Sequence, residues 1–159
     1  VIIACVAMLI YITIRFMDLK MGVSSILALV HDVLIMLAFY AIFRIPVNNS
    51  FIAALLTVLG YSINATIVIF DRVRENKKLM GRSSTEEIIN TSLYQTMRRS
   101  IYTSLTTLFA IGAVYVFGVQ SVKEFALPMM VGIIAGAYSS ICISGSIWYT
   151  LLPKAEKDV

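Results

Sequence analysis

The stretch that decides the fold is FIAALLTVLGYSINATIVIF, residues 51–70, which is followed directly by DRVRENKK, residues 71–78. The first segment carries no acidic or basic side chain and is long enough for an α-helix to cross the hydrocarbon core of a bilayer. The charged side chains of the second segment would then lie at the membrane surface. This part of the chain therefore predicts a transmembrane helix.

Four further apolar runs lie on either side of it, at residues 1–14, 23–43, 101–119 and 125–152. The 159-residue chain is 59% hydrophobic and 14% charged, with a mean hydropathy of +0.87. Soluble domains carry about 25% charged residues. We therefore predict an all-α membrane protein, a polytopic bundle of five transmembrane helices. The same composition argues against a soluble enzyme, a nucleic-acid-binding protein and a disulfide-rich secreted domain.

The first run, residues 1–14, is shorter than a transmembrane helix needs. It also lacks the basic leader and the small-residue cleavage site of a signal peptide. We expect it to be the truncated part of a longer helix. Cys5 and Cys142 both lie in apolar runs, where a thiol behaves as a small hydrophobic group, so no disulfide is predicted.

The basic residues are distributed asymmetrically. If successive connections alternate between the two membrane surfaces, all of the 13 basic residues except Arg44 and Lys123 fall on one side. Cytoplasmic loops of membrane proteins are enriched in Lys and Arg. We therefore expect the 71–100 segment and the C-terminal tail, residues 153–159, to be cytoplasmic.

The 71–100 segment has the pattern of a helical hairpin. Gly81 is a suitable stop for a helix that continues from the 51–70 run. A capping box then predicts the start of a second helix, either at Ser83 with Glu86 or at Ser84 with Glu87. That helix has one apolar stripe, made of Ile89, Leu93 and Met97. The hairpin is either a simple connection between two spans or a docking surface.

Asp32 is the one acidic or basic residue inside the five apolar runs, and His31 lies beside it. An ionisable group near the middle of a membrane helix costs about 2.5–3.5 kcal/mol on insertion scales, so it needs a partner or a wet pocket. Two interpretations stay open at this point: a proton pathway, or a fixed set of hydrogen bonds to neighbouring helices.

The 51–70 run also contains a polar line. Thr57, Gly60 and Asn64 share one helix face, which we predict to point into the bundle, with Asn64 making an interhelical hydrogen bond. In the 125–152 run, Gly132 and Gly136 follow the small-xxx-small pattern of close helix packing. No nucleophile–base pair or metal-ligand cluster is evident, so we expect no enzyme activity, cofactor or metal site.

Several motifs resemble one known family. Residues 60–76, GYSINATIVIFDRVREN, are similar to the fourth transmembrane segment of the SecF family, and QTMRRS at 95–100 with TSLTTL at 103–108 is similar to the fifth. ALVHDV at 28–33 resembles the third segment, and FAL at 125–127 with GIIAGAYSSI at 132–141 resembles the sixth. Together with SecD, this family belongs to the resistance-nodulation-division superfamily. The resemblance covers nearly the whole chain.

The resemblance implies helices 2–6 of a six-helix half, preceded in the family by one helix and a periplasmic domain. It implies an accessory subunit of the Sec translocase in the cytoplasmic membrane of a bacterium or archaeon. Such a subunit works with SecD and the SecY/SecE/SecG channel on exported polypeptides, using the proton motive force. Two alternatives are a small-molecule or lipid exporter half of the same superfamily and a passive membrane scaffold.

The resemblance also implies site residues. Arg99 matches the arginine of the family's Gln-Thr-x-x-Arg stretch, which is implicated in proton movement. The family commonly has Asn-Asp where this chain has Asn64-Ala65, so its proton-linked carboxylate is missing here. Two arrangements are then open: SecD holds the essential carboxylate, with Asn64, Thr66 and Arg99 as its hydrogen-bonding partners, or Asp32 of this chain also contributes. The candidate coupling residues in this chain are Asn64, Thr66, Arg99, Asp32 and His31.

Overall fold

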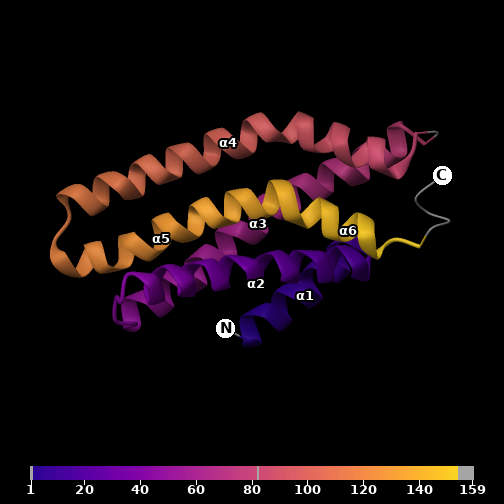
Figure 1. Ribbon diagram of the computed structural model, residues 1–159. Helices are drawn as coiled ribbons and strands as arrows, with labels where there is room; N and C mark the ends of the chain where they lie inside the picture. Colours follow the sequence, from indigo (N-terminus) through magenta and orange to yellow (C-terminus); the bar gives the residue numbers. More distant parts are fainter. Residues whose placement is uncertain (1, 82, 154–159) are drawn as a thin grey trace.

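The structure is a computed structural model that describes residues 2–81 and 83–153. The described residues form a helical bundle in which the main elements run side by side (Figure 1). The elements are α1 (Ile2–Phe16), α2 (Leu19–Ile42), α3 (Asn49–Leu79), α4 (Thr85–Phe117), α5 (Gln120–Tyr138), the π-helical segment η1 (Ser139–Ser144) and α6 (Gly145–Leu151). The predicted all-α membrane bundle is confirmed.

Within the described residues, four helical units are long and apolar enough to cross a membrane: α2, α3, α4 and the unit of α5, η1 and α6, which is continuous in Figure 1. α1 is a shorter apolar helix. Arg82 and the tail beyond residue 153 lie outside the described residues, as does the side chain of Cys5. Cys142 is a free, exposed thiol.

The α3–α4 connection continues both helices beyond their apolar runs. α3 extends through the polar segment to Leu79, and Ser84 is the N-cap of α4, accepting a hydrogen bond from the Glu87 amide at 3.3 Å. Of the two N-cap positions that the sequence offers, the structure uses Ser84. The side chain of Asn76 is 2% exposed and donates to Ser92 Oγ at 2.8 Å and to Gln95 Oε1 at 2.9 Å. These hydrogen bonds fasten the two helices together just before the turn.

α5 is the centre of the bundle and packs against α2, α3 and α4. The approach to α3 is close at Gly132, where an added Cβ would lie 2.5 Å from Val58 Cγ2 and 2.9 Å from Met36 Sδ. Gly136 is similarly close, because its Cβ would lie 3.0 Å from Ser62 Cβ. Glycine at these two positions lets the backbones approach more closely than any other residue would allow.

The start of α2 is tied to the last helix. Asp18 is the N-cap of α2, and its Oδ1 accepts a hydrogen bond from the Lys20 amide at 2.8 Å. Its Oδ2 accepts a second bond from Trp148 Nε1 in α6 at 3.2 Å. Trp148 is 1% exposed and packs edge-on against Phe70 of α3. This corner joins three helices at the end of the bundle where the α3–α4 turn also lies (Figure 1).

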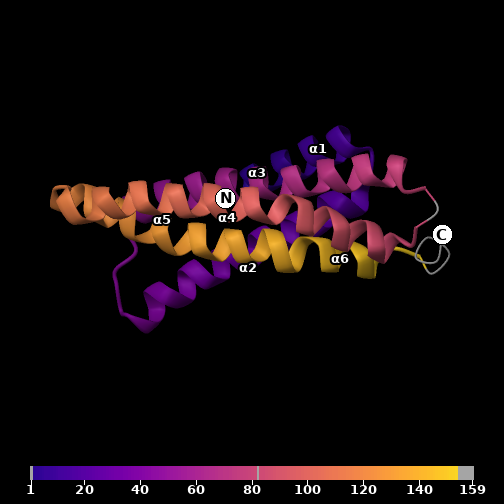
Figure 2. The ribbon, with the colours of Figure 1, turned by 90° about the horizontal axis from the view of Figure 1, so that it is seen from above.

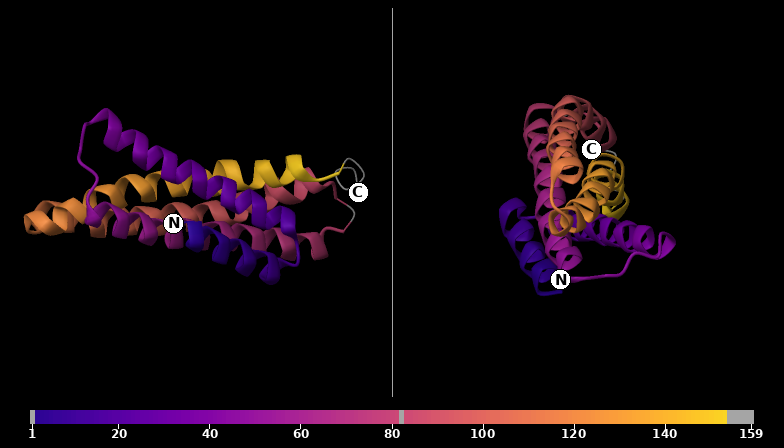
Figure 3. Two further views of the ribbon diagram at one scale, coloured as in Figure 1. Left: turned by 90° about the horizontal axis from the view of Figure 1, so that it is seen from below. Right: turned by 90° about the vertical axis from the view of Figure 1, so that its left-hand side faces the viewer.

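At the opposite end, α2 diverges from the other helices, and residues 43–48 return the chain to α3 (Figures 2 and 3). Of the four spans, α4 is the least buried: 6% of its most apolar stretch is buried, against 44% for α3. In a bilayer, such an apolar face contacts lipid or another helix.

Candidate functional site

A buried polar cluster lies where α2, α3 and α5 meet. The carboxyl group of Asp32 is fully buried; its Oδ2 accepts a 2.5 Å hydrogen bond from Ser62 Oγ in α3. Its Oδ1 lies 3.2 Å from Nδ1 of His31, whose side chain is 31% exposed. Each carboxyl oxygen therefore has a partner. This satisfies the requirement that a polar group inside a membrane bundle be hydrogen-bonded.

The π-helical segment extends this cluster. Ser140 Oγ lies 3.0 Å from Thr66 Oγ1 and donates a 3.2 Å hydrogen bond to the carbonyl oxygen of Ser62. Ser144 Oγ donates to the Ser140 carbonyl at 2.6 Å, and all three polar side chains are at most 2% exposed. Thr66 therefore lies in the same interior cluster as Asp32. Ser140 was not a candidate from the sequence, and the polar residues Asp32 and Thr66, which need partners inside the bundle, are the signal that could have pointed to it.

The face of α3 that points away from Ser62 and Thr66 forms a groove with α4. Asn64 and Ala65 lie there with Tyr61, Val68 and Arg99, around a small cavity of about 80 Å³. Tyr61 donates a 3.2 Å hydrogen bond to Ser104 across the groove. A larger, open cavity of about 470 Å³ adjoins the first, since Val68 and Arg99 line both. Asp71, Glu75 and Gln95 line its outer part, so the groove becomes more polar toward the α3–α4 turn.

The prediction that the face of Thr57, Gly60 and Asn64 points into the bundle is wrong. All three residues are exposed, and the polar residues of α3 that face the interior are Ser62 and Thr66. Thr57 bonds to the Ala53 carbonyl of its own helix at 2.9 Å, and Gly60 has no polar side chain. Asn64 does not make the predicted interhelical hydrogen bond to any described residue.

The candidate residues therefore separate into two groups. Asp32, His31 and Thr66 belong to the interior cluster, whereas Asn64 and Arg99 line the α3–α4 groove. Ser62 and Asn64 are two positions apart, which places their side chains about 200° apart around α3. No group of three His, Cys, Asp or Glu side chains suited to a metal ion occurs within residues 2–81 and 83–153.

The chain matches the model of a known protein family. The model of the family "Protein export membrane protein SecD/SecF, C-terminal" matches residues 1–154. This chain belongs to the SecD/SecF family. The assignment confirms the resemblance found in the sequence motifs.

Individual members of the SecD/SecF family are similar over nearly the whole chain. Protein translocase subunit SecF of Sebaldella termitidis is 46% identical over 159 residues, covering 96% of this chain and 51% of the relative. That of Borreliella burgdorferi is 44% identical, covering 95% of this chain and 50% of the relative. Protein translocase subunit SecDF of Bacillus subtilis is 42% identical, covering 92% of this chain and 20% of the relative. The chain spans about half the length of the curated SecF relatives it matches.

A solved structure of a family member has the same fold. The crystal structure of SecDF in its super-membrane-facing form superposes with a TM-score of 0.82 at 44% sequence identity. The match covers 88% of this chain and 19% of the SecDF chain. The helical bundle described above is therefore the arrangement that this part of SecDF adopts.

Proposed function

We propose that this chain is the membrane part of an accessory subunit of the Sec protein translocase, which works with SecD and the proton motive force to assist protein export. Two things support the proposal: the assignment to the SecD/SecF family and the names of its relatives as translocase subunits. The SecY/SecE/SecG channel and exported polypeptides would be its further partners. The subunit would act without enzyme chemistry of its own.

The proposed mechanism rests on the α3–α4 groove. Arg99 and Asn64 line it, and neither side chain has a hydrogen-bond or ion-pair partner among the described residues. Arginine stays charged in proteins, and Arg99 at the entrance of the apolar run needs a counter-charge or water as its partner. Ala65 supplies no carboxyl group in this groove. A carboxylate presented by SecD would pair with Arg99 and accept hydrogen bonds from Asn64, and its protonation would change both contacts.

Arg99 offers a sharp test because its neighbour is a matched control. The guanidinium of Arg98 lies 5.5 Å from the centre of the Tyr102 ring, whereas Arg99 lines the groove. In cells depleted of the native subunit, the full-length subunit with Arg99→Ala should slow the processing of a secreted reporter, and Arg98→Ala should not. Normal export with a stably inserted Arg99→Ala subunit would contradict the proposal.

We also propose that the chain lies in the cytoplasmic membrane with the α3–α4 turn and the C-terminus in the cytoplasm. The distribution of basic residues supports this orientation. In a subunit with Cys5 and Cys142 replaced by Ala, a membrane-impermeant maleimide applied to intact spheroplasts should label Val47→Cys and leave Ser83→Cys unlabelled. The reverse labelling pattern would overturn the orientation.

A further inference from the structure

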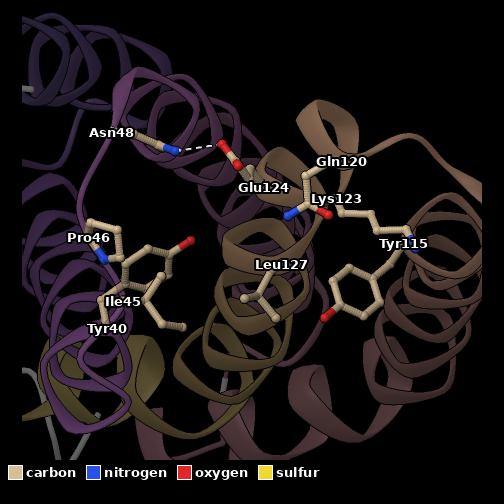
Figure 4. Close-up of a pocket in the computed structure, with 9 residues that line it drawn as sticks. All are labelled: Tyr40, Ile45, Pro46, Asn48, Tyr115, Gln120, Lys123, Glu124 and Leu127. Carbon is tan, nitrogen blue, oxygen red and sulfur yellow. Dashed lines mark hydrogen bonds between the residues drawn. The ribbon is translucent and has the colours of Figure 1, made fainter.

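A third cavity lies at the end of the bundle opposite the α3–α4 turn. It has a volume of about 310 Å³ and is enclosed by the end of α2, the 43–48 connection, the end of α4 and the first turn of α5 (Figure 4). Pockets of this size are large enough for small polar ligands and lipid headgroups. It is separate from both groups of candidate coupling residues, because none of them lines it.

Tyr40 is the most informative residue of this cavity. The side chain is 4% exposed, and its ring packs against Phe51 with the ring centres 4.5 Å apart. The hydroxyl group points into the cavity and donates no hydrogen bond to a described residue (Figure 4). The side chain is buried, but its hydroxyl faces the open cavity and is accessible from it. A ligand in the cavity can therefore accept a hydrogen bond from Tyr40.

The polar lining carries both signs of charge. Glu124 Oε2 accepts a 2.8 Å hydrogen bond from Asn48 Nδ2, which fixes the carboxylate at the rim (Figure 4). Lys123 precedes it in α5 and has no ion-pair partner among the described residues. Gln120 and Tyr115 add an amide and a second phenol. Adjacent acidic and basic groups, with neutral donors around them, suit a ligand that carries both a cation and an anion.

The position of the cavity indicates the source of that ligand. The apolar spans α2, α3, α4 and α5 all begin or end around it, at Ile42, Asn49, Phe117 and Gln120. This is the depth at which tyrosines gather at membrane–water boundaries and at which lipid headgroups lie. α2 diverges from the bundle at this end (Figures 2 and 3). Leu37, three residues before Tyr40 on α2, is 42% exposed, and Leu34, three residues further back, is 59% exposed.

We propose that this cavity binds the headgroup of an aminophospholipid, phosphatidylethanolamine. The primary ammonium group would donate to Glu124, the phosphate would accept from Tyr40, Lys123 would add a positive charge from the α4 side of the cavity, and the acyl chains would lie along Leu34 and Leu37. A choline headgroup has no N–H to donate to Glu124. A glycerol headgroup offers Glu124 no cation. The site therefore distinguishes three common phospholipids by their headgroups.

Native mass spectrometry of the full-length subunit with its partner tests the proposal. The purified complex is exchanged into micelles that contain equal amounts of dioleoyl phosphatidylethanolamine, phosphatidylcholine and phosphatidylglycerol. The complex should retain the ethanolamine lipid about tenfold over the other two, as expected for one charge-assisted hydrogen bond. Glu124→Gln should abolish the preference, and Tyr40→Phe should lower retention about threefold. Tyr61→Phe, which removes a hydroxyl from the α3–α4 groove, is the matched control and should change nothing.

Three outcomes would overturn the proposal. The first is equal retention of ethanolamine and choline lipids. The second is retention of the glycerol lipid at the level of the ethanolamine lipid, which would define a simple anion site. The third is unchanged retention in both pocket variants when their thermal unfolding in lipid-free detergent matches that of the wild type. A photo-crosslinker at Tyr115 that captures a polypeptide segment instead of lipid would equally contradict it.

Discussion

The hydroxyl of Ser62 in α3 donates a 2.5 Å hydrogen bond to the carboxyl group of Asp32 in α2. Both side chains are almost completely buried, and Gly136 of α5 leaves the space in which they meet. The one carboxyl group inside the apolar runs is therefore held by neighbouring helices. It lies in a different part of the bundle from Arg99.

The two interpretations of Asp32, a proton pathway and a fixed set of hydrogen bonds, predict different results for two substitutions. Asp32→Asn keeps the size of the side chain and can still accept from Ser62, so we expect a folded subunit that supports export at near the wild-type rate. Asp32→Ala leaves Ser62 without its acceptor and should lower the free energy of unfolding by about 1–3 kcal/mol. Thermal unfolding in detergent and reporter export measure the two effects. Loss of export by a folded Asp32→Asn subunit would instead assign Asp32 to the proton pathway.

Gly132 should tolerate no side chain. Its added Cβ would lie 2.5 Å and 2.6 Å from the two methyl groups of Val58, a buried and stiff side chain. We expect Gly132→Ala to destabilise the subunit by about 1–3 kcal/mol. Gly60→Ala is the control, because no heavy atom lies within 4 Å of the added Cβ. Equal melting temperatures for the two variants would contradict the close packing of α3 and α5.

Substitutions of two asparagines of α3 should have opposite effects on stability and export. Asn76 is buried and donates to Ser92 and Gln95, so Asn76→Ala should lower the free energy of unfolding by about 1–3 kcal/mol. Asn64 is exposed in the groove, and Asn64→Ala should change stability by less than about 0.5 kcal/mol while slowing export. A large loss of stability in Asn64→Ala would show that Asn64 is needed for folding.

The groove should accept the carboxyl group that Ala65 lacks. Ala65 lines the same cavity as Arg99, so Ala65→Asp places an acid beside a cation, and we expect a stable subunit with export that is retained or increased. Ala54→Asp is the control, since Ala54 is fully buried and offers no partner for a charge. That variant should fail to accumulate in the membrane. Failure of Ala65→Asp to accumulate would show that its position is packed.

The sequence was sufficient to predict the helical bundle, because each apolar run has to satisfy its backbone within one helix. It was not sufficient to predict which face of α3 points into the bundle. Thr57, Gly60 and Asn64 form one line on that helix, and Ser62 with Thr66 forms another on the opposite side. Which line faces the interior depends on Asp32 in α2 and Ser140 in η1, which require hydrogen-bonding partners there. Those contacts are between distant parts of the chain and leave no periodic signal.

The serine contacts of η1 depend on its wider turn. A π-helical turn holds one more residue than an α-helical turn, so it changes the angular phase of everything that follows. If the six residues from Ser139 to Ser144 formed an ordinary α-helix instead, with none removed, α6 would be rotated by about 100°. Trp148 would then turn away from Asp18, and the corner that joins α6 to α2 would open. The π-helical form of this six-residue interval therefore determines which face of α6 meets the start of α2.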